Sequence, residues 1–204
     1  MREGTQILSV ERGQPILFRA FILKASEGRT APDFSLKSLA GTGGRMDLIC
    51  RCIVAALHTA GGVNREAKIA VVLEGPPDPP LTITFDGSMM EKAPAGEVTA
   101  AELIMWAIAR KEGIRGISAE RKEFERVVSE YRDAGFAIYY LHEEGEDSLK
   151  MSFWEKPAFI LGDQKGLDPK SERFLDQMKA KRVSLGPHSY LASHCITIVS
   201  AQLQ

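Results

Sequence analysis

The segment GTGGRMD, residues 41–47, places three glycines directly before the predicted start of a helix. Free backbone amides at a helix N-terminus attract anions, and Arg45 carries a forked guanidinium that suits a phosphate group. Asp47 falls in the first helical turn. The segment matches neither the Walker A loop nor the GxGxxG fingerprint. A helix start with a charged first turn explains the same residues, so the segment taken alone favours that simpler interpretation over an anion site.

Three predicted strands in the last third of the chain end in short motifs that could border a ligand. The motifs are Leu141-His142-Glu143, Leu161-Gly162-Asp163 and Leu185-Gly186-Pro187. In an open α/β sheet, ligands bind beyond the carboxyl ends of the strands. Gly162 and Gly186 would let a flat ligand approach the main chain closely. Ordinary turns also use Gly and Pro, so the spacing leaves both a ligand site and plain turns open.

The cysteines and histidines form no recognisable metal or nucleophile motif. Cys50 and Cys52 are two residues apart on a predicted helix and therefore point to different faces. The histidines lack zinc-ligand spacing, so no metal site is predicted. His194 and Cys195 are adjacent, and neighbours on a helix diverge, which makes a thiol–imidazole pair geometrically poor. Three cysteines without framework spacing indicate a reduced chain.

Composition is typical of a soluble globular protein. The 204 residues are 44% apolar and 26% charged, so enough apolar surface is present to bury a core. The formal charge of −1 argues against coating of nucleic acid by bulk electrostatics, and a polyanion would need a local basic patch. No apolar run approaches the roughly 18 residues of a membrane span, and the N-terminus lacks the apolar region of a signal peptide. A cytoplasmic protein without membrane contact is expected.

Hydrophobic patterning predicts alternating strands and helices, and hence an α/β fold with a mostly parallel sheet. The predicted strands are 19–25, 68–74, 81–85, 136–141, 157–161 and 183–185. The predicted helices are 45–60, 100–111, 119–133, 169–180 and 191–201. The second is predicted to begin at a Thr99/Glu102 capping box, the third at Ser118 as its cap, and the fourth at Asp168-Pro169. The acidic stretch 142–147 is predicted to be a solvated turn. A preamble over 1–18 precedes one predicted domain over 19–204.

Six motifs occur in order between residues 19 and 200. They are PDFSL (32–36), GGRMDLICRC (43–52), VVLEGPPDPPLTITFDG (71–87), LHEEGED (141–147), FILGDQKGL (159–167) and SLGPHSYLASHCITIV (184–199). This combination resembles the archaeal-type tRNA pseudouridine N1-methyltransferases of the SPOUT superfamily. The resemblance implies a deep trefoil knot over about 137–204, S-adenosylmethionine as methyl donor and a homodimer. The implied reaction is N1-methylation of pseudouridine 54 in the T-loop of tRNA.

The resemblance also implies roles for individual residues. Methylation of N1 needs an acceptor for the N1 proton and a cation that steadies the developing anion. Arg45 is assigned the anion or phosphate contact, and Asp47 or Asp33 the role of base or base-positioning group. Tyr190 is assigned either stacking on a base or lining the cofactor pocket. Carried over by motif, the cofactor would be held by Leu141, Leu161, Gly162, Leu185, Gly186, Pro187, His188, Ser189 and Tyr190, with Cys195 nearby.

The chain departs from the family pattern at a few positions. Gln164 replaces the His of LGDH, and Leu191 and Ser193 replace a His and an Asp of HADHC. These changes bear on the RNA target more than on the methyl donor. Two alternatives therefore stay open: a SPOUT methyltransferase of another RNA such as rRNA, and a cofactor-binding RNA-interaction module without turnover.

Overall fold

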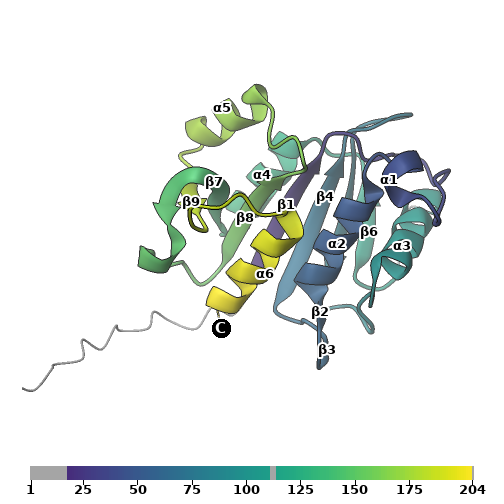
Figure 1. The fold of residues 1–204 in the computed structure, drawn as a ribbon, viewed down its shortest axis with the longest axis horizontal. Helices are drawn as coiled ribbons and strands as arrows, with labels where there is room; N and C mark the ends of the chain where they lie inside the picture. Colours follow the sequence, from purple (N-terminus) through teal and green to yellow (C-terminus); the bar gives the residue numbers. More distant parts are fainter. Residues whose placement is uncertain (1–17, 111–113, 204) are drawn as a thin grey trace, which may run out of the picture.

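The computed structural model describes residues 18–110 and 114–203, which form a seven-stranded sheet with helices on both faces (Figure 1). The sheet order is β6-β5-β4-β1-β8-β7-β9. Strands β4, β1, β8, β7 and β9 are mutually parallel, whereas β5 and β6 add antiparallel at one edge. The predicted α/β fold with a mostly parallel sheet is confirmed. The strand bounds are β1 Arg19–Ala25, β4 Ala67–Leu73, β5 Leu81–Asp86, β6 Ile117–Glu120, β7 Ala137–Asp147, β8 Pro157–Gly162 and β9 Lys181–Ser184.

The central strands are apolar on both faces because helices cover both. In β1, Phe21 and Leu23 contribute to one core cluster, whereas Ile22 contributes to the cluster on the opposite face. Successive side chains of a strand point to opposite faces, so a strand covered twice becomes a continuous apolar run. The rings of Phe21 and Phe159 stack with centroids 6.0 Å apart across the β1–β8 pair. The apolar runs recognised in the sequence are therefore the middle of the sheet.

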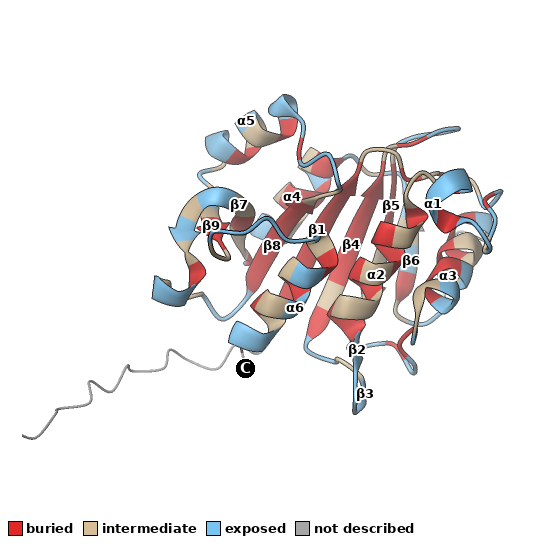
Figure 2. Cartoon of the chain, viewed as in Figure 1, coloured by how far each residue is buried: buried red, intermediate tan, exposed pale blue. Residues whose placement is uncertain are grey.

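Helices α2 (Met46–Leu57), α3 (Glu97–Arg110) and α6 (Ala192–Gln202) pack over one face of the sheet, and α4 (Phe124–Asp133) and α5 (Pro169–Gln177) over the other. Figure 2 shows the buried residues along the central strands and on the inward sides of these helices. Two short helical segments, α1 (Leu39–Thr42) and η1 (Ser148–Lys150), lie in connections. Most of the core therefore lies in two layers, one on each side of the sheet.

The helix predicted over 45–60 ends earlier than expected. It ends at Leu57, and residues 58–59 and 62–63 form a small antiparallel hairpin, β2 (His58–Thr59) with β3 (Gly62–Val63). Gly61 and Gly62 allow the tight turn between the two strands, and Gly62 adopts a φ of +108° that favours glycine. The predicted helix 45–60 therefore extends three residues too far at its end, and the hairpin was not predicted from the sequence.

The helix predicted over 119–133 was wrong in its first part. Residues 117–120 form β6, which pairs antiparallel with β5 in the register Phe85 to Ile117, and α4 begins only at Phe124. Ser118 is therefore a strand residue and not a helix cap. The capping box at Thr99 was also misplaced, because α3 begins at Glu97 and the Thr99 hydroxyl accepts a hydrogen bond from the Gly96 amide at 3.2 Å. In both places the error lies at a helix start.

The acidic stretch 142–147 is part of β7 and not a turn. Leu141 and Glu146 both align with Val183 of β9, so the residues between them bulge out of the ladder. Such a bulge redirects side chains at the end of a strand. Here it carries His142, Glu143 and Glu144 toward the carboxyl edge of the sheet, where they help to line a cleft.

Three further expectations concern the ends and the topology of the chain. The expected N-terminal extension, residues 1–18, lies outside the described residues apart from Phe18. None of the helices within 18–110 and 114–203 is both long and apolar enough to cross a membrane. The trefoil knot over about 137–204 stays a prediction.

Candidate active site

A cleft of about 910 Å³ opens where the carboxyl ends of β7, β8 and β9 meet the N-terminus of α6. Parallel strands end at the same edge of a sheet, so residues far apart in sequence converge there. Ten of the residues singled out from the sequence line this cleft: Arg45, Leu141, Leu161, Gly162, Leu185, Gly186, His188, Ser189, Tyr190 and Cys195. Pro187, Asp47 and Asp33 are not among its lining residues.

Gly162 is required by the way the chain folds back at the end of β8. A Cβ atom at this position would lie 2.3 Å from the carbonyl carbon of Gly166, and the two segments are joined by a bridge between Asp163 and Gly166. Only a glycine tolerates such an approach of two backbones. The loop 163–167 is consequently tight, and its backbone forms one wall of the cleft.

The opposite wall comes from the segment between β9 and α6. Leu185, Gly186, His188, Ser189 and Tyr190 lie here, and the side chain of Tyr190 is partly exposed at the cleft. Its ring lies edge-on to His188, with centroids 6.4 Å apart. Pro187 belongs to the same segment but is exposed away from the lining. This wall therefore combines the Leu185, His188 and Tyr190 side chains with the smaller residues Gly186 and Ser189.

Arg45 reaches the cleft from the N-terminus of α2. It occupies the N-cap position in the left-handed region, with a φ of +61°. A non-glycine residue in this region is strained, and such strain is found where the surrounding structure fixes a functional side chain. The guanidinium forms a fork with Asp47, with Nε to Oδ1 at 3.0 Å and Nη2 to Oδ2 at 3.1 Å.

Asp47 is held by two guanidinium groups. Besides Arg45, it accepts a hydrogen bond from Nη2 of Arg51 at 2.8 Å, and Arg51 reaches Glu97 at 3.2 Å. The hydrogen bonds from Arg45 lower the pKa of Asp47 to about 2, against the opposing effect of burial and with further help from Arg51. A carboxylate with so low a pKa is a weak proton acceptor at neutral pH. Its geometry suits it to orient Arg45.

Asp33 lies outside the cleft. It is exposed and forms its own fork with Arg29, at 2.8 Å from Nε to Oδ1 and 2.5 Å from Nη2 to Oδ2. The hydrogen bonds from Arg29 hold the pKa of Asp33 below its usual range. Of the two acidic candidates, the structure therefore brings only Asp47 into contact with Arg45.

Comparisons with known proteins identify the family of the chain. A sequence model of the family described as "Putative SAM-dependent RNA methyltransferase" matches residues 18–204. The chain is 40% identical over 193 residues to the tRNA (pseudouridine(54)-N(1))-methyltransferase of Thermococcus gammatolerans, covering 89% of this chain and 95% of that protein. It is 39% identical over 193 residues to the protein of the same name from Methanocaldococcus jannaschii, covering 89% and 94%. The chain belongs to this methyltransferase family.

The fold of this family member is also similar to a solved structure. Archaeoglobus fulgidus Nep1, crystallised with S-adenosylhomocysteine, matches with a TM-score of 0.62 over 91% of this chain and 96% of that chain. The two sequences are 13% identical, so this likeness supports the fold alone. This similarity agrees with the α/β fold class that hydrophobic patterning predicted for the chain.

Two residues that line the cleft of this methyltransferase-family chain, Tyr140 and Glu172, escaped the sequence reasoning. Tyr140 donates a hydrogen bond to Glu172 at 2.8 Å, and Nε2 of His142, from a motif that the sequence did single out, lies 3.9 Å from the same carboxylate. Burial first, and then the Glu172 carboxylate, raise the pKa of Tyr140. Glu172 lies in the first turn of α5, whose start at Asp168-Pro169 was recognised. The sequence signal located that helix but not the side of it that faces the cleft.

The thiols of this family member are poor nucleophiles. Burial raises the pKa of Cys50 to about 12 and also raises the pKa values of Cys52 and Cys195. Cys195 borders the cleft and donates weakly to the carbonyl of Tyr190 at 3.8 Å. Within the described residues, no group of three or more His, Cys, Asp or Glu side chains is arranged to hold a metal ion.

Proposed function

We propose that this protein is an S-adenosylmethionine-dependent enzyme that methylates N1 of pseudouridine 54 in the T-loop of tRNA. The observation that carries the proposal is the convergence of three strand-end segments and Arg45 on one cleft, in a chain of this methyltransferase family. The names of two similar relatives supply the position and the base. The cleft supplies a place where a donor and a base can be held together.

The size and the lining of the cleft support the proposed cofactor. About 910 Å³ lies within the usual range of small-molecule sites, which is about 300–1,000 Å³. Leu141, Leu161 and Leu185 offer apolar surface, and the tight backbone at Gly162 offers a flat wall. The lining also includes carboxylates, which suit a ligand with a positive charge on sulfur: Glu143, Glu144 and Glu172.

The proposed reaction needs no covalent intermediate with the protein. S-adenosylmethionine, when bound, supplies a methyl group on a positively charged sulfur that is already activated for displacement. The residues of the chain must hold N1 in line with that methyl group and exclude competing water. As the N1–carbon bond forms, the N1 proton passes to a water or a carboxylate, and the product is S-adenosylhomocysteine. Arg45 steadies the negative charge that develops on the base or binds an adjacent phosphate, while Asp47 orients Arg45.

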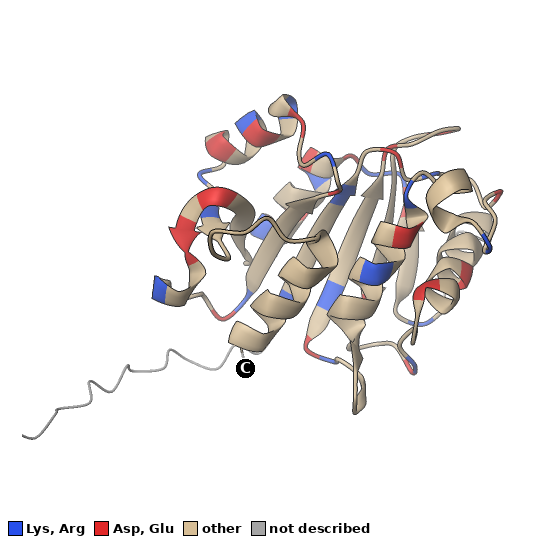
Figure 3. Cartoon of the chain, viewed as in Figure 1, with Lys and Arg blue, Asp and Glu red and all other residues tan. Residues whose placement is uncertain are grey.

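We further propose that tRNA is bound by a homodimer whose two subunits combine small basic patches. Figure 3 shows Lys and Arg on many elements with Asp and Glu among them, and not as one broad basic face. Part of this charge is already paired, since Arg182 binds Asp176 at 3.1 Å. Local placement of free cations at each cleft would then govern RNA affinity. Residues 19–204 are proposed to form one domain, with the knot in its last third.

The function is tested by incubating the purified protein with S-adenosylmethionine and T-loop RNAs that differ only at position 54. We expect N1-methylpseudouridine, identified by mass spectrometry of the nucleosides, with pseudouridine at 54 and no methylation with uridine. The proposal fails if tRNA from a strain that lacks this protein keeps its N1-methylpseudouridine. Methylation of rRNA alone would favour another RNA target. Binding of cofactor and RNA without turnover would favour an interaction module.

A further inference from the structure

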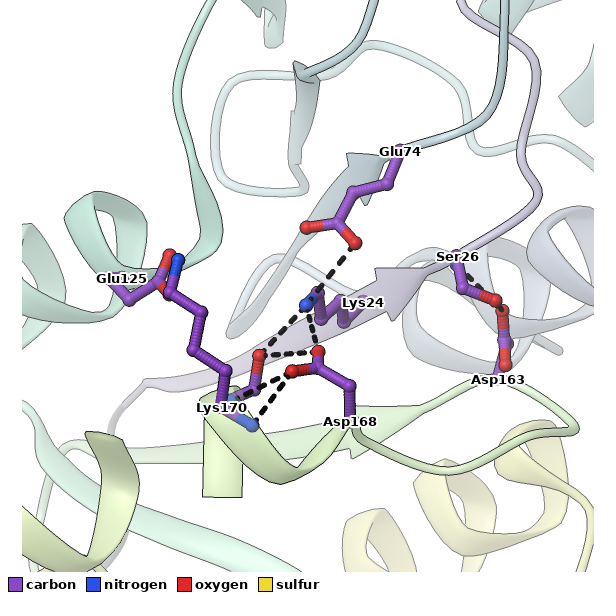
Figure 4. A network of polar contacts seen from close by, with 8 residues as sticks. Lys24, Ser26, Glu74, Glu125, Asp163, Asp168 and Lys170 are labelled. Carbon is purple, nitrogen blue, oxygen red and sulfur yellow. Dashed lines mark hydrogen bonds and ion pairs between the residues drawn. The ribbon is translucent and has the colours of Figure 1, made fainter. Parts of the chain in front are cut away.

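A buried lysine stands at the carboxyl end of β1, next to the loop that forms one wall of the cleft. Lys24 is 8% exposed, and its Nζ bonds to Glu74 at 3.2 Å, to Ser171 Oγ at 2.8 Å and to Asp168 (Figure 4). Burial alone would lower the pKa of Lys24, but the bonds to Asp168 and Glu74 outweigh it and the pKa is raised. Lys24 is therefore a charged group that joins β1 and β4 to the start of α5.

The partner of Lys24 also caps α5. Asp168 Oδ1 accepts the amides of Lys170 at 2.9 Å and Ser171 at 3.1 Å, and Oδ2 accepts the Ser171 hydroxyl at 2.8 Å. An N-cap carboxylate of this kind decides where a helix begins. The loop 163–167 runs directly into this cap and lines the cleft. Fixing Asp168 therefore fixes one end of the cleft wall.

The other end and the middle of the same loop are held by the residues that follow Lys24. Asp163 Oδ2 accepts both the amide and the hydroxyl of Ser26 at 2.7 Å. Glu27 accepts hydrogen bonds from Gln164 at 3.0 Å and from Lys165 at 2.7 Å. Figure 4 shows the Ser26–Asp163 pair beside the Lys24 cluster. All these side-chain bonds between the loop and the end of β1 go to residues 24–27.

The same segment contacts the turn that carries Arg45. A Cβ atom on Gly44, whose φ is +62°, would lie 1.8 Å from the Glu27 carbonyl oxygen, so the two backbones touch directly. The Arg29 amide donates to the Gly43 carbonyl at 3.2 Å. Residues 24–29 thus border the cleft wall on one side and the Arg45 turn on the other.

We propose that Lys24 is a positioning residue that holds the 163–168 loop in its cofactor-binding geometry and at a set distance from Arg45. The inference rests on the proposed function, since it assigns the loop to S-adenosylmethionine. The Lys24 side chain is 10% exposed and that of Asp168 is 44% exposed, so the ion pair is only partly buried, and we assign it the role of fixing the geometry of its partners more than of adding stability. Ordering a binding loop is a role that uses this property. Lys24 acts through Asp168 and does not touch the ligand itself.

The test compares Lys24→Met with a matched control, Lys170→Met. Lys170 lies in the same first turn of α5 but is 75% exposed and pairs with Glu125 at 2.8 Å, away from the loop. We expect Lys24→Met to weaken S-adenosylhomocysteine binding about tenfold by calorimetry, as expected for the loss of a charge-assisted hydrogen bond. Lys170→Met should stay within about twofold. Turnover assays should show a higher KM for S-adenosylmethionine and an unchanged KM for RNA.

A second variant keeps the inference testable if Lys24→Met does not fold. Asp168→Asn retains a capping oxygen for α5 and removes the charge that pairs with Lys24. It should weaken binding by a similar factor, and the double variant should be no weaker than the worse single variant. Unchanged affinity in a folded Lys24→Met or Asp168→Asn protein would overturn the role of Lys24. Failure of the unmodified protein to bind S-adenosylhomocysteine would instead overturn the proposed function.

Discussion

The double arginine contact of Asp47 yields a prediction that separates two roles for this residue. Asp47→Asn keeps the size of the side chain but removes the charge that holds Arg45 and Arg51. A hydrogen bond to a charged group contributes about 1.5–3 kcal/mol. The Arg45 side chain is 37% exposed, so solvent screening reduces this value toward about 1.4 kcal/mol. We therefore expect kcat/KM to fall about tenfold, through misplacement of Arg45.

Loss of a general base would have a larger effect, of about 10²–10⁴-fold. The pH profile gives a second criterion. The pKa of Asp47 is about 2 in the folded protein, against about 4 in the unfolded chain. The stability that its charge contributes is therefore fully present above pH about 4 and is lost as the pH falls through about 2. The acid limb of kcat/KM should therefore keep its position in Asp47→Asn, while the plateau drops.

The assay is methyl transfer to a pseudouridine-54 T-loop RNA, measured across the pH range in which the protein stays folded. Asp33→Asn is the matched control, because Asp33 forms a similar fork with Arg29 outside the cleft and should leave kcat/KM nearly unchanged. A loss of about a thousandfold in Asp47→Asn, together with disappearance of the acid limb, would refute the positioning role and make Asp47 the proton acceptor.

Three further predictions concern other residues. Gly162→Ala should weaken S-adenosylhomocysteine binding at least about tenfold by calorimetry, because its Cβ would lie 2.3 Å from the Gly166 backbone; unchanged affinity would show that the wall can move. The ammonium group of Lys68 is surrounded by three aromatic rings, those of Phe18, Tyr131 and Phe136. Lys68→Ala should therefore lower the free energy of unfolding by about 1–3 kcal/mol in urea titrations, and an unchanged midpoint would contradict this. Cys195→Ser should keep kcat within about threefold, because burial raises the thiol pKa; loss of turnover with intact cofactor binding would give the thiol a chemical role.

Local sequence signals were sufficient to predict those helices and strands whose type does not depend on contacts with distant parts of the chain. The apolar runs around Phe21 and Phe159 predicted strands, and these strands form the middle of the sheet. Asp168-Pro169 marked the start of α5 correctly, because capping and the fixed φ of proline act within one turn. The motif order likewise identified the family and ten of the residues that line the cleft.

Other parts of the structure depend on contacts with segments that are distant in sequence, and hydrophobic patterning does not reveal such contacts. Residues 119–120 were predicted to begin a helix capped by Ser118, yet they belong to β6 because they pair with the edge of β5. The stretch 142–147 looks like a solvated turn, but β9 pairs with its far end and turns it into a bulge that borders the cleft. The sequence left Asp33 and Asp47 as alternatives for the same role. Each forms a fork with an arginine that is close in sequence, Arg29 or Arg45, and the tertiary structure decides between them because it places only Arg45 at the cleft beyond the carboxyl ends of the parallel strands.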